Sequence, residues 1–285
     1  MQRSPRNTPS DNFLTKIDFY RAQVDLALHK ELCQRQNSPF FTPFVDAFAG
    51  GKRLRPIIVL IAYDSVGGRA GDPLPAAVAI ELAHMESLIH DDIIDGDGVR
   101  RNAQAFHARY GEEMALLSAD FMLSMILSIA ARYSDQRIMS VLATATAQMC
   151  EGELTERLIG EMNKAVSPSV YQGIVLKKTA SLFEAAATMG GLIGGATTAD
   201  LDALAAYGRA LGVAYQIHDD ITDWEQSRMI TLDLKGVHHP QKEYLFETAT
   251  KFVREAIDSL RPLNSSEAKQ TLLHLAERVD SRAIH

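Results

Sequence analysis

One short acidic stretch occurs twice in this chain of 285 residues and constrains its fold more than any other feature. Residues 89–95 read IHDDIID, and residues 217–223 repeat them almost letter for letter as IHDDITD. Each copy ends a segment with helical spacing of apolar residues, and in a helix positions i and i+4 share one face. The chain must therefore accommodate two helices that each end in a row of like charges.

Two such acidic clusters facing each other across a cleft would bind cations. Carboxylates without thiols or a matched set of histidines suit a hard ion such as Mg²⁺, which typically binds through one or two carboxylates plus substrate phosphates. The alternative is a pair of solvated acidic helix ends, which is common for a single Asp-Asp pair. The repetition in a helical context favours the metal site.

The spacing of apolar residues predicts helices along the chain and no strand of useful length. We predict helices over residues 11–35, 57–66, 73–95, 114–133, 137–158, 168–178 and beyond, 201–224, 246–260 and 266–282. Proline and glycine mark several boundaries, such as Ser167-Pro168 at a helix start and Gly96 at a helix end. We expect one all-α domain over residues 1–285, with its helices around a central cavity and residues 1–12 flexible.

Composition excludes some classes of function. The net charge of −7 argues against a general nucleic-acid surface. Cys33 and Cys150 lack metal or redox spacing, and the polar start lacks the apolar core of a signal peptide, so we expect a cytoplasmic protein. The most membrane-like run, residues 114–131, carries Asp120 and several serines. It is therefore expected to be a buried helix or a subunit interface, and no membrane span is predicted.

Each acidic cluster continues a stripe along its predicted helix. One stripe consists of His84, Leu88, Asp91 and Asp95, and the other of Gly212, Gln216, Asp219 and Asp223. A stripe that mixes polar with small or apolar groups lines a cavity more naturally than it packs a core. A histidine such as His84 is, taken alone, usually a hydrogen-bonded core residue, but its alignment with the carboxylates favours the cavity.

Three basic groups accompany the acids. They are Lys52 with Arg53 and Arg55, the pair Arg100-Arg101, and Lys177-Lys178 followed by Thr179. Arginine offers a planar fork to phosphate oxygens and lysine a point charge, although any one basic pair is more often a solvated surface. Together with the acids they favour a diphosphate held partly by metal. The sequence has no P-loop and no dinucleotide glycine fingerprint, which disfavours nucleoside triphosphates.

Five motifs in order resemble the all-trans isoprenyl diphosphate synthases over residues 44–224. They are GGKRLRP (50–56), SLIHDDIIDGDGVRR (87–101), HARYG (107–111), KTASLF (178–183) and YQI (215–217) with the second acidic cluster. The resemblance implies Mg²⁺-dependent head-to-tail condensation of isopentenyl diphosphate with an allylic diphosphate. Three Mg²⁺ ions would be held by Asp91, Asp95 and Asp219, with Asp92, Asp220 and Asp223 orienting ligands or waters.

The resemblance also implies the roles of other residues. The allylic diphosphate would contact Arg100, Lys178, Thr179 and Gln216, and the diphosphate of isopentenyl diphosphate would contact Lys52, Arg55, His84 and Arg101. Glu86 and Ser87 would line the well for the growing tail and stop growth near farnesyl or geranylgeranyl diphosphate. A homodimer would form through residues 114–131.

The chain departs from this pattern at Asn102, at Ala119 and in the stretch that follows the second acidic cluster. Compared with the family, this stretch lacks about as many residues as one helix contains. Lys235 is only a weak candidate for the lysine that would close over the allylic diphosphate. We expect residues 224–242 to become ordered on binding ligand. A terpene cyclase of the same fold and a non-catalytic subunit of a heteromeric synthase remain alternatives.

Overall fold

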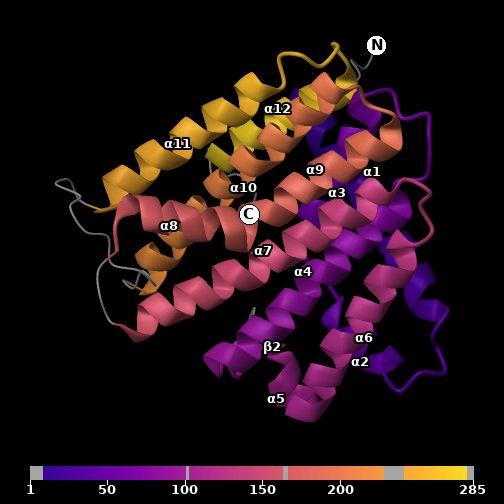
Figure 1. Ribbon diagram of the computed structural model, residues 1–285, viewed down its shortest axis with the longest axis vertical. Coiled ribbons are helices and arrows are strands. Elements are labelled where there is room, and N and C mark those ends of the chain that lie inside the picture. The colour runs from indigo at the N-terminus through magenta and orange to yellow at the C-terminus, as the bar shows by residue number, and fades with distance from the viewer. Residues whose placement is uncertain (1–8, 101–102, 163–165, 228–240, 281–285) are drawn as a thin grey trace, which may run out of the picture. The chain divides into compact units, whose positions relative to one another are not determined.

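The computed structural model describes residues 9–100, 103–162, 166–227 and 241–280, and these ranges are almost entirely helical. The helices are α1 (Pro9–Cys33), α2 (Phe41–Ala47), α3 (Leu54–Ser65), α4 (Leu74–Asp95), α5 (Phe106–Tyr110), α6 (Glu112–Ala130), α7 (Gln136–Glu161), α8 (Pro168–Val175), α9 (Ser181–Gly194), α10 (Thr198–Ser227), α11 (Gln241–Ser259) and α12 (Glu267–Asp280). A π-helical turn, η1 (Leu176–Ala180), joins α8 to α9. The prediction of an all-α fold is confirmed (Figure 1).

The structure adds short elements that apolar spacing could not predict. Helices α2 and α5 have only seven and five residues, too few for a periodic pattern. A two-stranded antiparallel hairpin pairs β1 (Val99–Arg100) with β2 (Ala103–Gln104), directly after the first acidic cluster. The long helices lie where the spacing predicted them, and Ser167 caps α8 by accepting a hydrogen bond from the Val170 amide.

The chain divides into two compact units. One comprises residues 1–60 and 74–132, and the other residues 61–73 and 133–285. The first acidic cluster belongs to the first unit and the second cluster to the second. The expectation of a single domain over the whole chain stays a prediction.

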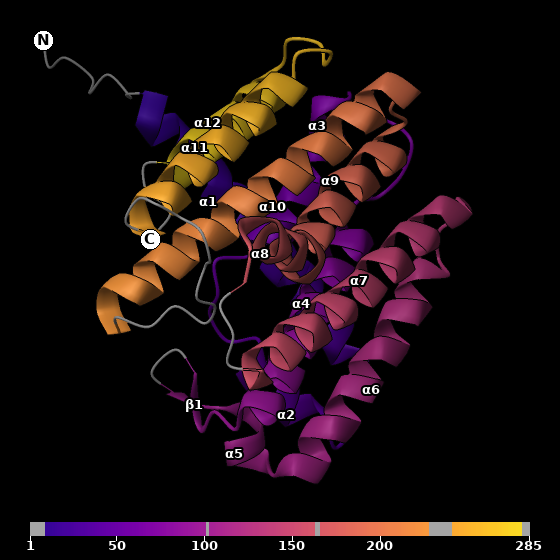
Figure 2. The same cartoon turned by 60° about the vertical axis from the view of Figure 1, so that its left-hand side comes forward.

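In the first unit, α4 is the central helix. It contacts α1, α5 and α6, and Figures 1 and 2 show α4 and α6 side by side. Every residue from Ala76 to Ala83 is buried, so this part of α4 is enclosed on all sides. Apart from Glu81, these residues are apolar, and a helix that is apolar all round is typical of a core. The amino-terminal half of α4 is therefore fixed in the core, and its carboxyl-terminal half carries the acidic cluster outward.

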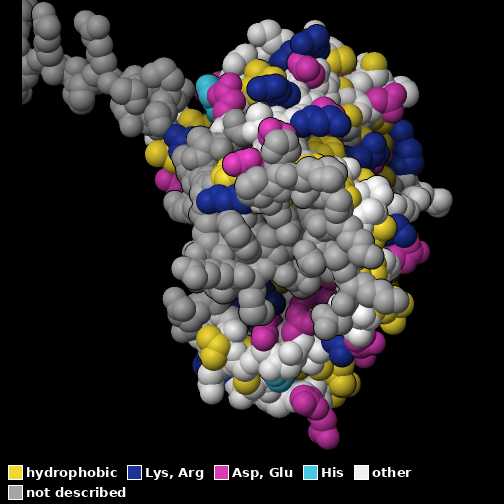
Figure 3. Space-filling view, turned by 90° about the vertical axis from the view of Figure 1, so that its left-hand side faces the viewer, with side chains coloured by type: hydrophobic (Ala, Val, Ile, Leu, Met, Phe, Trp, Pro, Cys, Tyr) yellow, Lys and Arg dark blue, Asp and Glu magenta, His cyan; other side chains and the backbone are white. Residues whose placement is uncertain are grey.

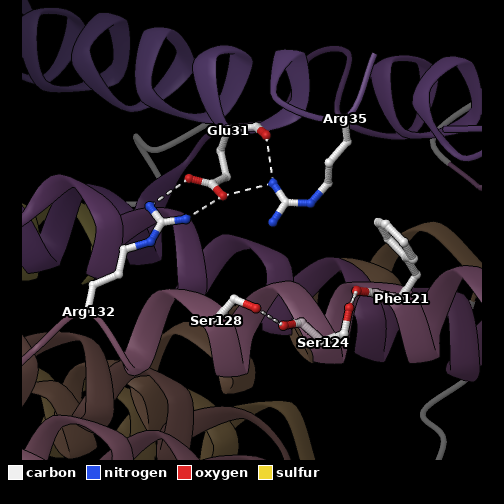
Figure 4. Close-up of polar contacts among 6 residues, drawn as sticks. All are labelled: Glu31, Arg35, Phe121, Ser124, Ser128 and Arg132. Carbon is white, nitrogen blue, oxygen red and sulfur yellow. Dashed lines mark hydrogen bonds and ion pairs between the residues drawn. The ribbon is translucent and has the colours of Figure 1, made fainter. Parts of the chain in front are cut away.

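A buried carboxylate joins α1 to the end of α6 (Figure 4). Glu31 accepts hydrogen bonds from both terminal nitrogens of Arg132, at 2.7 and 2.9 Å, and one from Arg35 at 2.9 Å. Burial alone would raise the pKa of Glu31, but hydrogen bonds and charges of these two arginines outweigh it and lower that pKa. A buried carboxylate paired in this way is tolerated where an isolated one would not be.

Helix α6 has one buried face and one exposed apolar face. Leu116, Leu117, Leu123 and Leu127 are between 41 and 57% exposed. Ser124 and Ser128 donate to the helix's own carbonyl oxygens, at 2.7 and 2.8 Å (Figure 4). By length and composition alone α6 could cross a membrane, but 44% of its most apolar window is buried within the protein. Core helices of soluble proteins pass the same test.

In the second unit, α10 lies between α9 and α11 (Figure 2). Close approach to the α9 segment depends on two glycines one turn apart. A Cβ on Gly208 would lie 2.5 Å from the Phe183 carbonyl oxygen, and one on Gly212 would lie 2.6 Å from the Ala180 Cα. Gly212 therefore serves backbone packing, although it begins the stripe that we predicted to line a cavity. On the other side, the buried Tyr207 hydroxyl donates to the Leu272 carbonyl of α12 at 2.8 Å.

Charged side chains of both signs are interspersed with apolar ones on the face drawn in Figure 3. This mixture agrees with a composition of 29 basic and 36 acidic residues. Several arginines and lysines lie beside carboxylates, as in the exposed pair of Arg209 with Glu184 at 2.5 Å. Exposed pairs of this kind contribute little to stability.

Candidate active site

The first acidic cluster occupies the last turn of α4. Asp91 is half-buried, Asp92 is buried and Asp95 is exposed. Gly96 follows with a positive φ of 70° and ends the helix, and the β1–β2 hairpin then brings Arg100 back to form an ion pair with Asp92. The middle aspartate is thus bound within its own unit, while its two neighbours in the cluster lie at more accessible positions.

Arg55 and His84 lie together in the first unit. The Arg55 Nη1 lies 3.1 Å from the His84 Nε2, so α3 and α4 present an adjacent guanidinium and imidazole. Both residues were predicted to bind the same diphosphate, and such a pair supplies several N–H donors to one anion. Lys52, from the same GGKRLRP motif, is exposed.

Arg53 has a different environment from its neighbours in that motif. It is the only non-glycine residue with a positive φ, 54°, among the described residues. Its buried guanidinium donates to Asp25 at 2.9 Å, to Glu81 at 2.7 Å and to the Phe48 carbonyl. Burial alone would lower the pKa of Arg53, but the two carboxylates raise it. Arg53 therefore holds in place the segment that carries Lys52 and Arg55. The sequence did not show that Arg53 has this structural role while its neighbours are assigned to substrate.

The two residues predicted to control product length both lie half-buried on α4. Burial, followed by the charge of Asp120 on α6, raises the pKa of Glu86 to about 7. The Ser87 hydroxyl donates to the His84 carbonyl of its own helix at 2.9 Å. Glu86 is therefore a carboxyl group that changes charge near neutral pH.

The second acidic cluster lies on α10, where Asp219 is half-buried and Asp223 exposed. Asp220 accepts hydrogen bonds on both oxygens, from the Tyr171 hydroxyl and from Gln216 Nε2 at 2.8 Å. Gln216 in turn accepts from Thr179 Oγ1 at 2.7 Å. The structure thus brings together Thr179, Gln216 and Asp220, which the sequence assigned to one site. Tyr171 is an additional member that the sequence analysis missed.

Burial raises the pKa of Asp220 to about 6, against the hydrogen bonds from Tyr171 and Gln216 and with a further contribution from the charges of Glu156 and Asp219. Burial and the same carboxylate raise the pKa of Tyr171 well above its usual range. The tyrosine therefore stays protonated and donates. Asp220 is thus held by neutral donors, whereas Asp92 is paired with a charged one.

Lys178 lies in the π-helical turn η1, between two glutamates of α7. Its Nζ is 2.7 Å from Glu153 and 2.5 Å from Glu156. Burial alone would lower the pKa of Lys178, but the charges and hydrogen bonds of both glutamates raise it above its ordinary value. Single π-helical turns frequently occur at functional sites. The sequence placed Lys178 in the site but gave no sign of its two acidic partners.

The carboxylates fit a hard cation in their chemistry. Both clusters offer carboxylate oxygens, which are ligands that Mg²⁺ prefers. Their middle aspartates are held by bonds within the protein, and their outer aspartates are half-buried or exposed. The outer carboxylates can therefore bind an ion that keeps several of its waters. Among the described residues, no three His, Cys, Asp or Glu side chains are already grouped to hold a metal ion. Arg101, Asn102 and Lys235 lie outside the described residues, as do residues 228–240 of the segment predicted to become ordered.

Comparison with known proteins gives a consistent result. The family model described as polyprenyl synthetase matches residues 39–231. A geranylgeranyl diphosphate synthase of Methanosarcina mazei is 41% identical over 193 residues, which cover 66% of this chain and 59% of that protein. A geranylfarnesyl diphosphate synthase of the same organism is 33% identical over 79% of this chain and 75% of its own length.

The fold has close solved counterparts. The crystal structure of geranylgeranyl pyrophosphate synthetase from Pyrococcus horikoshii superposes with a TM-score of 0.83 at 27% identity, covering 96% of this chain and all of that one. The sequence match to the Methanosarcina mazei geranylgeranyl synthase spans about three fifths of that relative's length, as its 59% coverage shows.

Proposed function

Because the chain belongs to the polyprenyl synthetase family, we propose that it is a prenyltransferase that condenses isopentenyl diphosphate with an allylic diphosphate. The product would be a short or medium all-trans polyprenyl diphosphate. One observation carries the proposal: α4 and α10 each carry a copy of the same Asp-Asp-x-x-Asp motif, and the middle aspartate of each copy is held by bonds within its own unit. The named activities of the relatives support the same reaction class.

Mg²⁺ would be held by Asp91, Asp95 and Asp219, and when bound it supplies positive charge that stabilises the departing diphosphate. Three ions per active site are proposed. Asp92 and Asp220 orient the clusters through the bonds described above, and Asp223 completes the second cluster. These roles remain proposals that rest on the donor chemistry and the family resemblance.

The basic residues divide between the two substrates. We assign the allylic diphosphate to Arg100, Lys178, Thr179 and Gln216, and the second diphosphate to Lys52, Arg55, His84 and Arg101. The contact between Arg55 and His84 and the hydrogen bond between Thr179 and Gln216 support this division, because each joins residues assigned to the same anion.

Product length is proposed to depend on Glu86 and Ser87. A hydrocarbon tail beside an ionised carboxylate removes its hydration without replacing it. Each isoprene unit adds five carbons, so its burial contributes about 4 kcal/mol at about 0.8 kcal/mol per carbon. A charged Glu86 could offset much of one such step. We therefore propose that growth stops near farnesyl or geranylgeranyl diphosphate, and Glu86→Ala should shift the products toward longer chains.

The proposed assembly is a cytoplasmic homodimer that forms through α6. Four exposed leucines on one helix make an apolar surface that a second copy would cover. Sedimentation at micromolar concentration should show a dimer, and Leu123→Glu should shift it toward monomer. A monomeric wild-type protein would contradict this assembly.

The function is tested by incubating the full chain with Mg²⁺, isopentenyl diphosphate and each allylic primer in turn. An elongated diphosphate supports the proposal. A hydrocarbon product would instead show a terpene cyclase, and absence of turnover would show a non-catalytic subunit. For variants of the second acidic cluster, such as Asp219→Ala, the control is Asp202→Asn. Asp202 is an exposed aspartate on the same helix and lies outside the cluster.

A further inference from the structure

Lys178, which is assigned to the allylic diphosphate, lies between two of the chain's own carboxylates. Glu153 and Glu156 lie one helical turn apart on α7, and both direct carboxylate oxygens to its ammonium group at 2.7 and 2.5 Å. The side chains are only 31% exposed for Lys178, 15% for Glu153 and 18% for Glu156. Partly buried ion pairs are screened less by solvent than exposed ones.

The backbone fixes this arrangement. A Cβ on Gly152 would lie 2.4 Å from the Lys178 amide nitrogen, so α7 and the π-helical turn are in direct contact. The Ser181 hydroxyl donates to the Lys177 carbonyl at 2.6 Å, which satisfies a carbonyl oxygen of the same turn. On α7, Glu153 is the residue after Gly152, and Glu156 lies one turn after Gly152. Close backbone packing of α7 against η1 therefore places the two glutamates beside the Lys178 ammonium group.

The adjacent lysine provides a comparison within the same turn. Lys177 also pairs with a glutamate of α7, Glu151, at 2.7 Å. Those side chains are 47 and 63% exposed, and only one carboxylate is involved. Exposed pairs of this kind have little net effect. The chain thus offers one solvated lysine and one that is partly buried between two acids.

The charge of this cluster opposes an unaccompanied anion. Lys178 donates a hydrogen bond to Glu156 and lies within ion-pair distance of Glu153, so one positive charge faces two negative ones. A bare diphosphate must displace a carboxylate from Lys178 and approach a net negative charge. A diphosphate that arrives with Mg²⁺ carries less negative charge, so the same carboxylates repel it less.

We propose that Glu153 and Glu156 are positioning residues that reserve Lys178 for a metal-bound diphosphate and exclude metal-free diphosphate from the site. The inference rests on the proposed function, because it takes Lys178 to be a diphosphate ligand. It assigns these two glutamates a role in selecting the form of the substrate.

The test is calorimetric titration of the full chain with inorganic pyrophosphate, with and without Mg²⁺ and with chelator in the metal-free arm. Glu156→Gln removes one charge and keeps the shape, so it should raise the metal-free affinity about tenfold, from the loss of one repulsive charge a few ångströms away. Glu153→Gln should act in the same direction.

The matched control is Glu151→Gln, which removes the same charge from the exposed pair and should leave both affinities unchanged. A gain of affinity cannot come from misfolding, so it separates positioning from a merely structural role. If Glu156→Gln does not fold, Glu153→Gln carries the test. Unchanged or weaker metal-free binding in a folded glutamine variant overturns the inference.

The two proposals fail differently. If the wild type binds pyrophosphate with Mg²⁺ and condenses its substrates, but the glutamine variants show no metal-free gain, only the role of the two glutamates is refuted. If the wild type does not bind pyrophosphate in the presence of Mg²⁺, the proposed diphosphate site is refuted, and the inference fails with it.

Discussion

Glu86 should make the stability of the protein fall as the pH rises from about 4.5 to about 7. Its carboxyl group is half-buried on α4, and burial together with the charge of Asp120 raises its pKa from 4.5 to about 7. Below pH 4.5 the group is protonated in both the folded and the unfolded chain, so its contribution is fully present. Between pH 4.5 and 7 the unfolded chain loses this proton while the folded protein keeps it, and the contribution is lost.

The size of the effect follows from the same two values. At about 1.4 kcal/mol per pH unit, the difference corresponds to about 3 kcal/mol of unfolding free energy between pH 4.5 and pH 8. Glu86→Gln removes the ionisation and nearly preserves the shape. The variant should therefore match the wild type near pH 4.5 and exceed it by up to about 3 kcal/mol at pH 8. Asp120→Asn should show a smaller gain, because Asp120 is the second cause of the raised pKa.

The assay is urea unfolding at a fixed protein concentration, since association would otherwise change the apparent stability. Glu277→Gln is the control, because Glu277 is an exposed glutamate on α12 and should give a difference that does not vary with pH. Product analysis at pH 6 and pH 8.5 adds a second readout: the wild type should make longer chains at the lower pH, and Glu86→Gln should not. A Glu86→Gln stability difference that is constant from pH 4.5 to 8 would refute the reasoning.

Three further predictions concern activity and packing. Alanine at either Asp91 or Asp219 should lower kcat by orders of magnitude with the circular dichroism spectrum unchanged, and full wild-type activity in excess chelator would contradict it. Gly152→Ala should cost about 2 kcal/mol of stability and reduce kcat by displacing the π-helical turn. Gly160→Ala on the same helix meets no atom within 4 Å, so it should leave kcat unchanged and should not lower the stability. Arg132→Ala should cost about 2 kcal/mol near pH 7 by leaving a buried carboxylate less well paired. That cost should shrink as the pH falls through the lowered pKa of this carboxylate, and an equal cost at pH 3 and pH 7 would count against the pairing.

Local patterns predicted much of the fold, because helix spacing, caps and helix breakers depend on residues that are close together in the sequence. The Ser167 cap of α8 and the end of α4 before Gly96 are both of this kind. Partners distant in sequence were not predictable in this way. Arg53 and Arg55 lie in one motif, yet one is buried against Asp25 and the other contacts His84. Only the packing of α1 and α4 around the motif distinguishes them.

The candidate site shows the same limit. The sequence identified Lys178, but its partners lie 22 and 25 positions earlier on another helix, where a glutamate pair looks like any solvated face. Tyr171 was missed because, in the sequence, a tyrosine at the start of a helix resembles a core residue. Only the structure shows that its hydroxyl donates a hydrogen bond to Asp220. Gly212 was taken as part of a cavity stripe, whereas the contact with Ala180 shows a packing role.

The two acidic clusters are nearly identical in sequence but electrostatically different. Asp92 is buried and paired with the charged guanidinium of Arg100, so its negative charge is neutralised inside the first unit. Asp220 is held only by the neutral donors Tyr171 and Gln216, with Glu156 nearby, and its pKa rises to about 6. A raised pKa means that the ionised form of Asp220 is disfavoured where it lies, and a positive charge placed nearby would favour it. A divalent ion beside the second cluster should therefore lower the pKa of Asp220, whereas the charge of Asp92 is already balanced by Arg100, although the letters of the two motifs differ at a single position.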